Sequence, residues 1–172
     1  MKKLFTLALV ATGLFMATGT QAQSNKKKAS PAAVTTQTLK NGSIITINYG
    51  QPSVKGRVIG TDVEPMEGKI WRTGANEATT FETTKEIKVN GRTLPAGKYS
   101  LFTIFNGREA TIIFNKVANQ WGSTDYAEKD DQLRVSTKVL NDDFSEKLTF
   151  DIDASGRVDL KWGNKNAAFY LE

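Results

Sequence analysis

The residues best suited to chemistry lie close together in the segment 69–80. Within positions 71–77 the chain carries a large aromatic residue, a cation, a glycine, an amide and a carboxylate: Trp71, Arg72, Gly74, Asn76 and Glu77. No simple helix or strand periodicity produces this mixture, whereas a turn that presents polar groups beside an apolar anchor does. We therefore expect a turn in which the indole could stack on a carbohydrate or peptide and the guanidinium could bind an oxyanion.

Each of these side chains also has a purely structural interpretation. Large aromatics are mostly buried anchors, so we favour a core position for Trp71, with Arg72 either tied to loop carbonyls or pointing outward. Asn76 and Glu77 could bond the neighbouring backbone instead of a ligand. Catalysis by Glu77 would need a second carboxylate at a suitable separation. Candidates for that second carboxylate are Glu64, Glu67, Asp125 and Asp130.

Further candidates lie outside the turn. Trp121 and Tyr126 share a polar loop and could form a stacking platform, or could close the end of the fold. Gln51, Lys55 and Arg57 could join Arg72 in a polar cluster if the first strands lie beside the turn. The set of candidate ligand-binding residues is Gln51, Arg57, Trp71, Arg72, Asn76, Glu77, Trp121 and Tyr126. No catalytic residue can be assigned.

The acidic stretch 125–131 raises the question of calcium. Its spacing does not match an EF-hand loop, and acidic loops are usually only solvated, so we assign no metal ligand. The chain contains neither histidine nor cysteine. This excludes a Ser-His-Asp triad, a thiol nucleophile and the usual ligands of zinc, copper and iron. Catalysis would require paired carboxylates, a tuned lysine or a hard metal ion. We expect no cofactor and favour binding over catalysis.

The N-terminal residues indicate export. Residues 1–22 have two lysines, an apolar run and a small-x-small cleavage pattern ending at Ala22, which is typical of a secretory signal peptide. The polar segment 23–35 is expected to be a flexible leader, and residues 36–172 a single domain that is periplasmic or secreted, with no transmembrane span after cleavage. The formal charge of +5 is concentrated in the lysines near the N-terminus. We therefore expect no nucleic-acid partner.

Alternating apolar residues predict strands along the rest of the chain. Residues 43–49 place apolar side chains on one face, and residues 98–105 carry them on both faces, which favours a central strand. Residues 54–59 read as another strand. Asn90-Gly91 supplies the two positive-φ positions of a type I′ hairpin turn. About ten short strands with turns between them predict an all-β fold, a single antiparallel β-sandwich that is jelly-roll-like or a partly closed barrel.

Several segments in order resemble a known bacterial family. They are Gln-Pro-Ser-Val-Lys-Gly-Arg at 51–57, Trp-Arg-Thr-Gly-Ala-Asn-Glu-Ala-Thr at 71–79 and Leu-Pro-Ala-Gly-Lys-Tyr-Ser-Leu at 94–101, followed by shorter matches at 113–115, 120–122 and 129–134. The chain resembles the domain of unknown function 2911 family over residues 36–171. This resemblance implies an exported protein without an assigned activity, and it supplies no catalytic residue.

Three functional hypotheses follow. The first is an exported, non-enzymatic β-sandwich that binds a small polar or carbohydrate-like ligand, or an envelope protein, through residues 71–77; it requires a concave patch with an exposed aromatic and Arg72. The second is a carboxylate-dependent hydrolase acting on an envelope or dietary glycan, which requires two carboxylates facing one cleft. The third is a structural envelope protein, which requires buried tryptophans and an Arg72 bonded to internal carbonyls.

Overall fold

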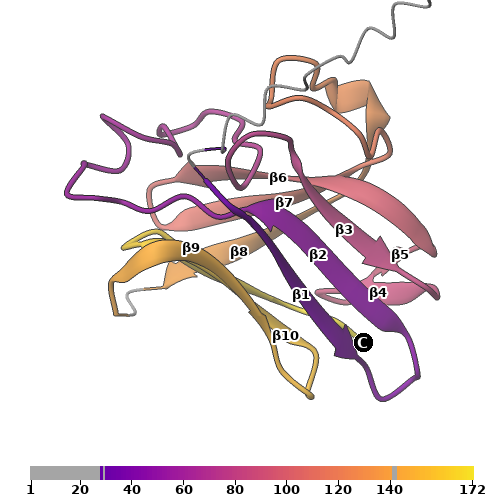
Figure 1. Ribbon diagram of the computed structural model, residues 1–172. Helices are drawn as coiled ribbons and strands as arrows, with labels where there is room; N and C mark the ends of the chain where they lie inside the picture. Colours follow the sequence, from indigo (N-terminus) through magenta and orange to yellow (C-terminus); the bar gives the residue numbers. More distant parts are fainter. Residues whose placement is uncertain (1–27, 29, 141–142) are drawn as a thin grey trace, which may run out of the picture.

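The computed structural model describes residues 28, 30–140 and 143–172 and is built almost entirely of β-strands (Figure 1). This confirms the predicted all-β class. The strands are β1 (Ala32–Thr38), β2 (Ile44–Gly50), β3 (Thr79–Thr83), β4 (Ile87–Val89), β5 (Arg92–Leu94), β6 (Gly97–Asn106), β7 (Glu109–Asn115), β8 (Asp131–Leu140), β9 (Ser145–Ile152), β10 (Arg157–Gly163) and β11 (Asn166–Tyr170), with one 3-10 turn, η1 (Glu128–Asp130), before β8. The predicted signal peptide, residues 1–22, lies outside the described residues.

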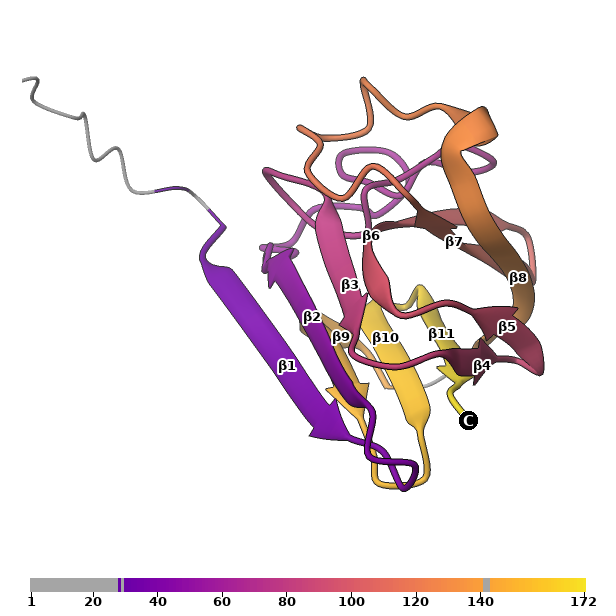
Figure 2. The same ribbon diagram turned by 90° about the vertical axis from the view of Figure 1, so that its right-hand side faces the viewer.

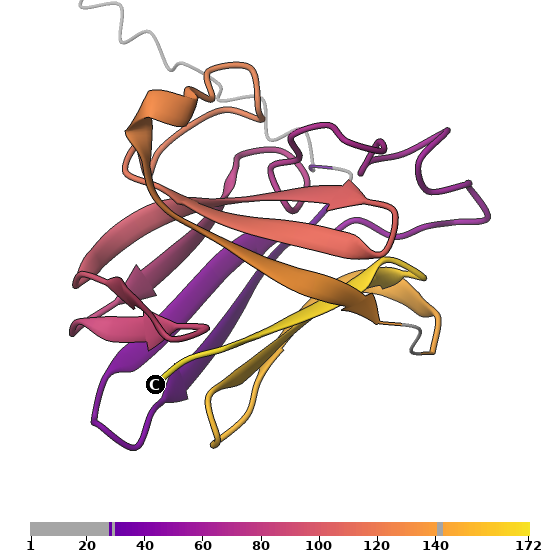
Figure 3. The same cartoon turned by 180° about the vertical axis from the view of Figure 1, so that it is seen from behind.

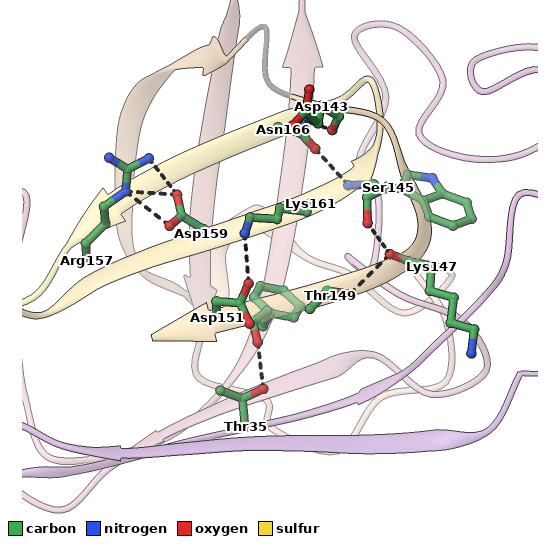
Figure 4. Close-up of polar contacts among 12 residues, drawn as sticks. Thr35, Asp143, Ser145, Lys147, Thr149, Asp151, Arg157, Asp159, Lys161 and Asn166 are labelled. Atoms are coloured by element: carbon green, nitrogen blue, oxygen red, sulfur yellow. Dashed lines mark hydrogen bonds and ion pairs between the residues drawn. The ribbon is translucent and has the colours of Figure 1, made fainter. Parts of the chain in front are cut away.

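Nine strands form one antiparallel sheet in the order β1-β2-β3-β6-β7-β8-β11-β10-β9. The sheet curls until its two edge strands, β1 and β9, approach each other, so that it is a nearly closed barrel. Thr35 on β1 donates a hydrogen bond from Oγ1 to the carbonyl of Phe150 on β9 (2.7 Å, Figure 4). The ring of Tyr49 meets Phe150 edge-on, with centroids 5.0 Å apart. These contacts join the sheet edges where the backbone ladder stops.

The barrel core follows the alternation predicted from the sequence. Ile45, Ile47 and Tyr49 of β2 are all buried on the inner face. Strand β6 is buried on both faces, because its outer residue Phe102 is covered by the loop between β7 and β8 and meets Tyr126 of that loop edge-on. This explains the apolar residues on both sides of β6 and confirms its central place in the sheet.

The hairpin β4–β5 lies at the end of the barrel away from the long loops (Figure 2). Asn90 and Gly91 have φ angles of 48° and 78°, which confirms the expected turn with two positive-φ residues. The hairpin is held to the C-terminus by an antiparallel bridge between Val89 and Leu171. Burial of Val89 against the core makes this hairpin a cap on that end of the barrel.

The outer surface of β9 and β10 is a charged face (Figure 4). The guanidinium of Arg157 binds both carboxylate oxygens of Asp159, and Lys161 Nζ lies 2.9 Å from Asp151 Oδ2 across the two strands. The first pair lies within β10, and the second joins β10 to β9 and stabilises the two neighbouring strands modestly. These charges bind one another, so we do not place the candidate site on this face.

Two long loops, 51–78 and 116–130, lie at the other end of the barrel, next to β6, β7 and β8, which face the viewer in Figure 3. The predicted strand over 54–59 does not form. Lys55 and Gly56 have φ angles of 51° and 70°, which break an extended backbone, so the segment is part of the first loop. In addition, β1 begins at Ala32, so residues 32–35, expected in the flexible leader, belong to the barrel. Among the described residues, no helix is long and apolar enough to cross a membrane.

Candidate ligand-binding site

Trp71 anchors the first long loop to the barrel wall. Its backbone N–H and C=O both pair with Thr103 of β6, at 2.9 Å each, and its indole Nε1 donates to the carbonyl of Gly74. The side chain is 2% exposed. Trp71 is therefore a core residue, as we favoured from the sequence, and it cannot be the stacking surface of a binding site.

The bend after Trp71 is pressed against the end of β2. Thr73 and Asn76 both adopt positive φ angles, 53° and 66°, so the chain reverses within a few residues. The N–H of Ala75 donates to the carbonyl of Gly50 at 3.2 Å. A Cβ on Gly50 would lie 2.0 Å from the carbonyl oxygen of Ala75. Glycine at position 50 is what lets the bend approach the strand.

Arg72 is fixed through its backbone, while the Nε of its guanidinium lacks a partner among the described residues. Its carbonyl accepts from the N–H of Thr79. Its Nε is buried, and within the described part of the chain it has no hydrogen-bond partner, nor does Arg72 form an ion pair there. Gly122 of the second loop lies beside Nη1, since a Cβ on that glycine would be 3.7 Å away. A buried unbonded donor costs roughly 1–3 kcal/mol, and more when it is charged.

Arg72 lines a cavity of about 350 Å³. This volume is at the lower end of the range of small-molecule sites, roughly 300–1,000 Å³. We call it the arginine cavity. It is lined by Ser30, Pro52, Arg57, Asp62, Val63, Glu64, Met66, Trp71, Arg72, Gly74, Ala75 and Trp162. Most of these residues come from the first long loop, and Trp162 comes from β10.

Arg57 shares the arginine cavity with Arg72, as we considered from the sequence. Its Nε donates to the carbonyl of Val54 at 3.0 Å, and its Nη2 donates to that of Ser53 at 2.6 Å. These bonds fix the direction of the side chain and leave its remaining N–H groups for other acceptors. Two guanidinium groups on one small cavity favour a carboxylate or phosphate ligand, because the planar fork matches two oxygens at once.

Two carboxylates also line the arginine cavity, Asp62 and Glu64. Asp62 Oδ2 accepts from the N–H of Val58, and Glu64 Oε2 accepts from the N–H of Met66, both at 2.8 Å. Neither carboxylate is ion-paired to an arginine within the described residues. Both are therefore oriented by their own loop, while positive and negative groups coexist on the cavity wall.

A second pair of recesses lies on the outer face of the sheet, around Glu77. They measure about 620 and 290 Å³ and share Glu77, Ala78 and Thr80. Trp121 lines the smaller recess with 61% of its surface exposed. Glu77 forms an ion pair with Lys28, whose hydrogen bond lowers the pKa of that carboxyl. The structure thus separates Glu77 and Trp121 from the arginine cavity.

Asn76 and Gln51 are engaged with the backbone. Asn76 lines the larger recess, but its Nδ2 donates to the carbonyl of Ser30 at 3.1 Å. Gln51 Nε2 donates to the carbonyl of Leu148 on β9 at 3.0 Å. Both bonds hold the ends of strands in place, and neither residue lines the arginine cavity.

Tyr126 is part of the support of the second loop. Its hydroxyl donates to Asp131 Oδ2 at 2.7 Å and accepts from Arg134 Nη2, while its ring packs on Phe102. Burial, followed by the hydrogen bond to Asp131, raises the pKa of Tyr126 to about 12. Of the two interpretations made from the sequence, this geometry supports a plug that closes the end of the fold.

The acidic stretch before β8 gathers no metal-binding group. Asp131 accepts from Asn115, Tyr126 and Arg134, and Glu128 lies 3.3 Å from Arg134. Throughout the part of the chain that the structure describes, no three acidic side chains are placed to hold one metal ion. Two carboxylates of this stretch, those of Glu128 and Asp131, belong to the polar network around Arg134.

Sequence reasoning missed Asp62 and Trp162 as members of the cavity, and treated Glu64 only as a possible partner of Glu77. Trp162 is 1% exposed and donates from Nε1 to the carbonyl of Glu64 at 2.7 Å, which ties the first loop to β10. No periodic signal could have revealed this contact, because it depends on the closure of the barrel.

The fold and cavity define an all-β, nearly closed antiparallel barrel with a charged recess under its long loops. The chain matches the family described as "Protein of unknown function (DUF2911)" over residues 30–171, and it belongs to that family. This confirms the resemblance found in the sequence motifs. Comparison with curated proteins and with solved structures gave no match.

Proposed function

We propose that this protein is an exported, non-enzymatic binding module for a small polar ligand that carries a carboxylate or phosphate group. The observation that supports the proposal is the guanidinium of Arg72, which lines the arginine cavity with its buried Nε unbonded in the described structure. Export rests on the N-terminal pattern of residues 1–22.

The chemistry of Arg72 favours an oxyanion over other ligands. A guanidinium is always charged and presents donors in a fixed plane, so a carboxylate or phosphate can satisfy two of them together. Arg57 is held in the same cavity by backbone carbonyls, which reduces the entropy lost on binding. An oxyanion in the cavity would give the guanidinium of Arg72 the acceptor that the described residues do not provide.

The proposal is tested by titrating the mature protein with a panel of small carboxylates and organic phosphates in a calorimeter. We expect at least one to bind, and Arg72→Ala to weaken it by about 10-fold to 100-fold, the effect of losing a charge-assisted hydrogen bond. Arg108→Ala is the matched control. Arg108 is exposed in the β6–β7 turn, so its replacement removes the same charge at a position away from the cavity. Equal weakening by both variants, or no binding by any compound, contradicts the proposal.

The hydrolase hypothesis is the second candidate, because Asp62 and Glu64 line one cavity as it requires. We rank it second since each carboxylate has an oxygen bonded to a backbone N–H of its own loop. Incubation with chromogenic glycosides tests it: hydrolysis that disappears in both Asp62→Asn and Glu64→Gln would replace the binding proposal with an enzymatic one.

A further inference from the structure

The arginine cavity carries balanced charges. Arg57 and Arg72 contribute two positive groups to its lining, and Asp62 and Glu64 contribute two negative groups. From this balance we infer that the ligand is a zwitterion, an amino acid or short peptide with a carboxylate and an ammonium group. The inference rests on the proposed function, since it takes the binding of an oxyanion at Arg72 as given and specifies the rest of the ligand.

The carboxylates are set in place before any ligand arrives. One oxygen of each is held by a backbone N–H, from Val58 for Asp62 and from Met66 for Glu64. Within the described structure each carboxylate accepts this one hydrogen bond, and neither forms an ion pair, so Asp62 Oδ1 and Glu64 Oε1 are left unbonded. An ammonium group has three donors and no acceptor, so it is suited to an unbonded carboxylate oxygen of this kind.

A ligand with negative charge only fits this cavity less well. It would gain from the guanidinium groups but would be repelled by the two carboxylates, and like charges brought together at a binding surface cost affinity. An ammonium on the same ligand turns this repulsion into attraction. The carboxylates therefore favour zwitterions over simple acids and organic phosphates.

The other residues that line the cavity indicate the size of the ligand and the character of its side chain. Pro52, Val63 and Met66 provide apolar surface that is partly exposed to the cavity. Methionine adapts its shape readily, so this surface can accept apolar side chains of different form. A cavity of about 350 Å³ suits an amino acid or a dipeptide and not a longer chain.

The test compares three forms of the same molecule by calorimetry at constant ionic strength. For each apolar L-amino acid we would titrate the free amino acid, the corresponding carboxylic acid without the amino group, and the amino-acid amide without the carboxylate. We expect the free amino acid to bind at least about tenfold more tightly than the simple acid, and the amide to bind most weakly.

Substitutions test whether Asp62 and Glu64 cause the preference for the amino acid over the simple acid. In the double variant Asp62→Asn, Glu64→Gln we expect the amino acid and the simple acid to bind within about twofold of each other, because the amide oxygens can still accept the backbone bonds but carry no charge. Glu109→Gln, an exposed carboxylate on β7, is the matched control and should leave the preference unchanged. Circular dichroism checks that each variant is folded.

The outcomes separate this inference from the proposed function. If the simple acid binds in an Arg72-dependent way and the amino acid binds no better, the proposed function stands and the zwitterion is excluded. If the preference survives in the double variant, the carboxylates do not hold the ammonium and the inference fails. If none of the three forms binds, while other carboxylates or phosphates do, the zwitterion inference fails and the proposed function stands.

Discussion

Arg57 and Arg72 line the same cavity, but in the described structure only Arg57 hydrogen-bonds its guanidinium to the protein. Arg57 donates to the carbonyls of Val54 and Ser53, whereas the buried Nε of Arg72 has no acceptor. The guanidinium of Arg57 therefore stabilises the loop, whereas that of Arg72 contains a buried donor without an acceptor among the described residues. Unsatisfied buried donors are unfavourable for folding, and departures of this kind from the usual rules are expected at functional sites.

The two arginines should respond oppositely to replacement by methionine. Arg72→Met removes a buried unbonded donor, so we expect the free energy of unfolding to stay the same or to rise by up to about 1–3 kcal/mol. Arg57→Met removes two hydrogen bonds to the backbone and should lower it by about 1–2 kcal/mol. Urea denaturation with unchanged m values measures both. A loss of more than about 1 kcal/mol in Arg72→Met would show that its guanidinium supports the fold.

Trp71 and Trp121 differ in burial, so their replacement should affect stability differently. Trp71 is 2% exposed and packs at a tilt on Phe105, while Trp121 is 61% exposed. Trp71→Ala should cost about 3–5 kcal/mol through lost burial and the cavity left behind. Trp121→Ala should change stability by no more than about 0.5 kcal/mol. Thermal and urea denaturation compare them, and similar losses in the two variants would refute the burial that we describe.

Local patterns predicted the local features of this fold. The alternation of Ile45, Ile47 and Tyr49 predicted which face of β2 is buried, since side chains of a strand alternate between faces. Asn90-Gly91 predicted a hairpin turn because both positions need positive φ. The position of the bend after Trp71 was also predicted, because no regular period accommodates its residues. In each case the information lies within a few consecutive residues.

The membership of the cavity could not be predicted in the same way. Trp162 reaches the first loop only because β10 follows β11 in the sheet, and that strand order comes from pairings between distant segments. The strand predicted over 54–59 is absent for a local reason. Lys55 and Gly56 adopt positive φ and form a turn, although the valines on either side suggested a strand. A turn at this pair is what places Arg57 on the cavity wall instead of on a strand.

Gly50 should tolerate no side chain. A Cβ there would lie 2.0 Å from the carbonyl oxygen of Ala75, so Gly50→Ala must displace the bend that holds Arg72. We expect a loss of about 1–3 kcal/mol or more, as for other overpacked sites, together with weaker ligand binding. Gly68→Ala is the control: its φ of 67° costs about 1–2 kcal/mol, but nothing lies near its Cβ, so binding should persist. Equal binding by both variants would show that the bend does not position Arg72.

Tyr126 should make stability depend on pH in the alkaline range. Its pKa is raised from 10.0 to about 12 by burial, so the folded protein holds the phenolic proton more tightly than the unfolded chain does. The resulting stability is fully present below pH 10 and is lost as the pH rises toward 12. Tyr126→Phe should flatten this decline and, by removing the bonds to Asp131 and Arg134, lower stability at neutral pH by about 1–2 kcal/mol. Tyr170→Phe, at a 49% exposed position, is the control and should keep the wild-type slope. Urea midpoints measured across this pH range compare the three proteins, and an unchanged slope in Tyr126→Phe would mean that another group is responsible.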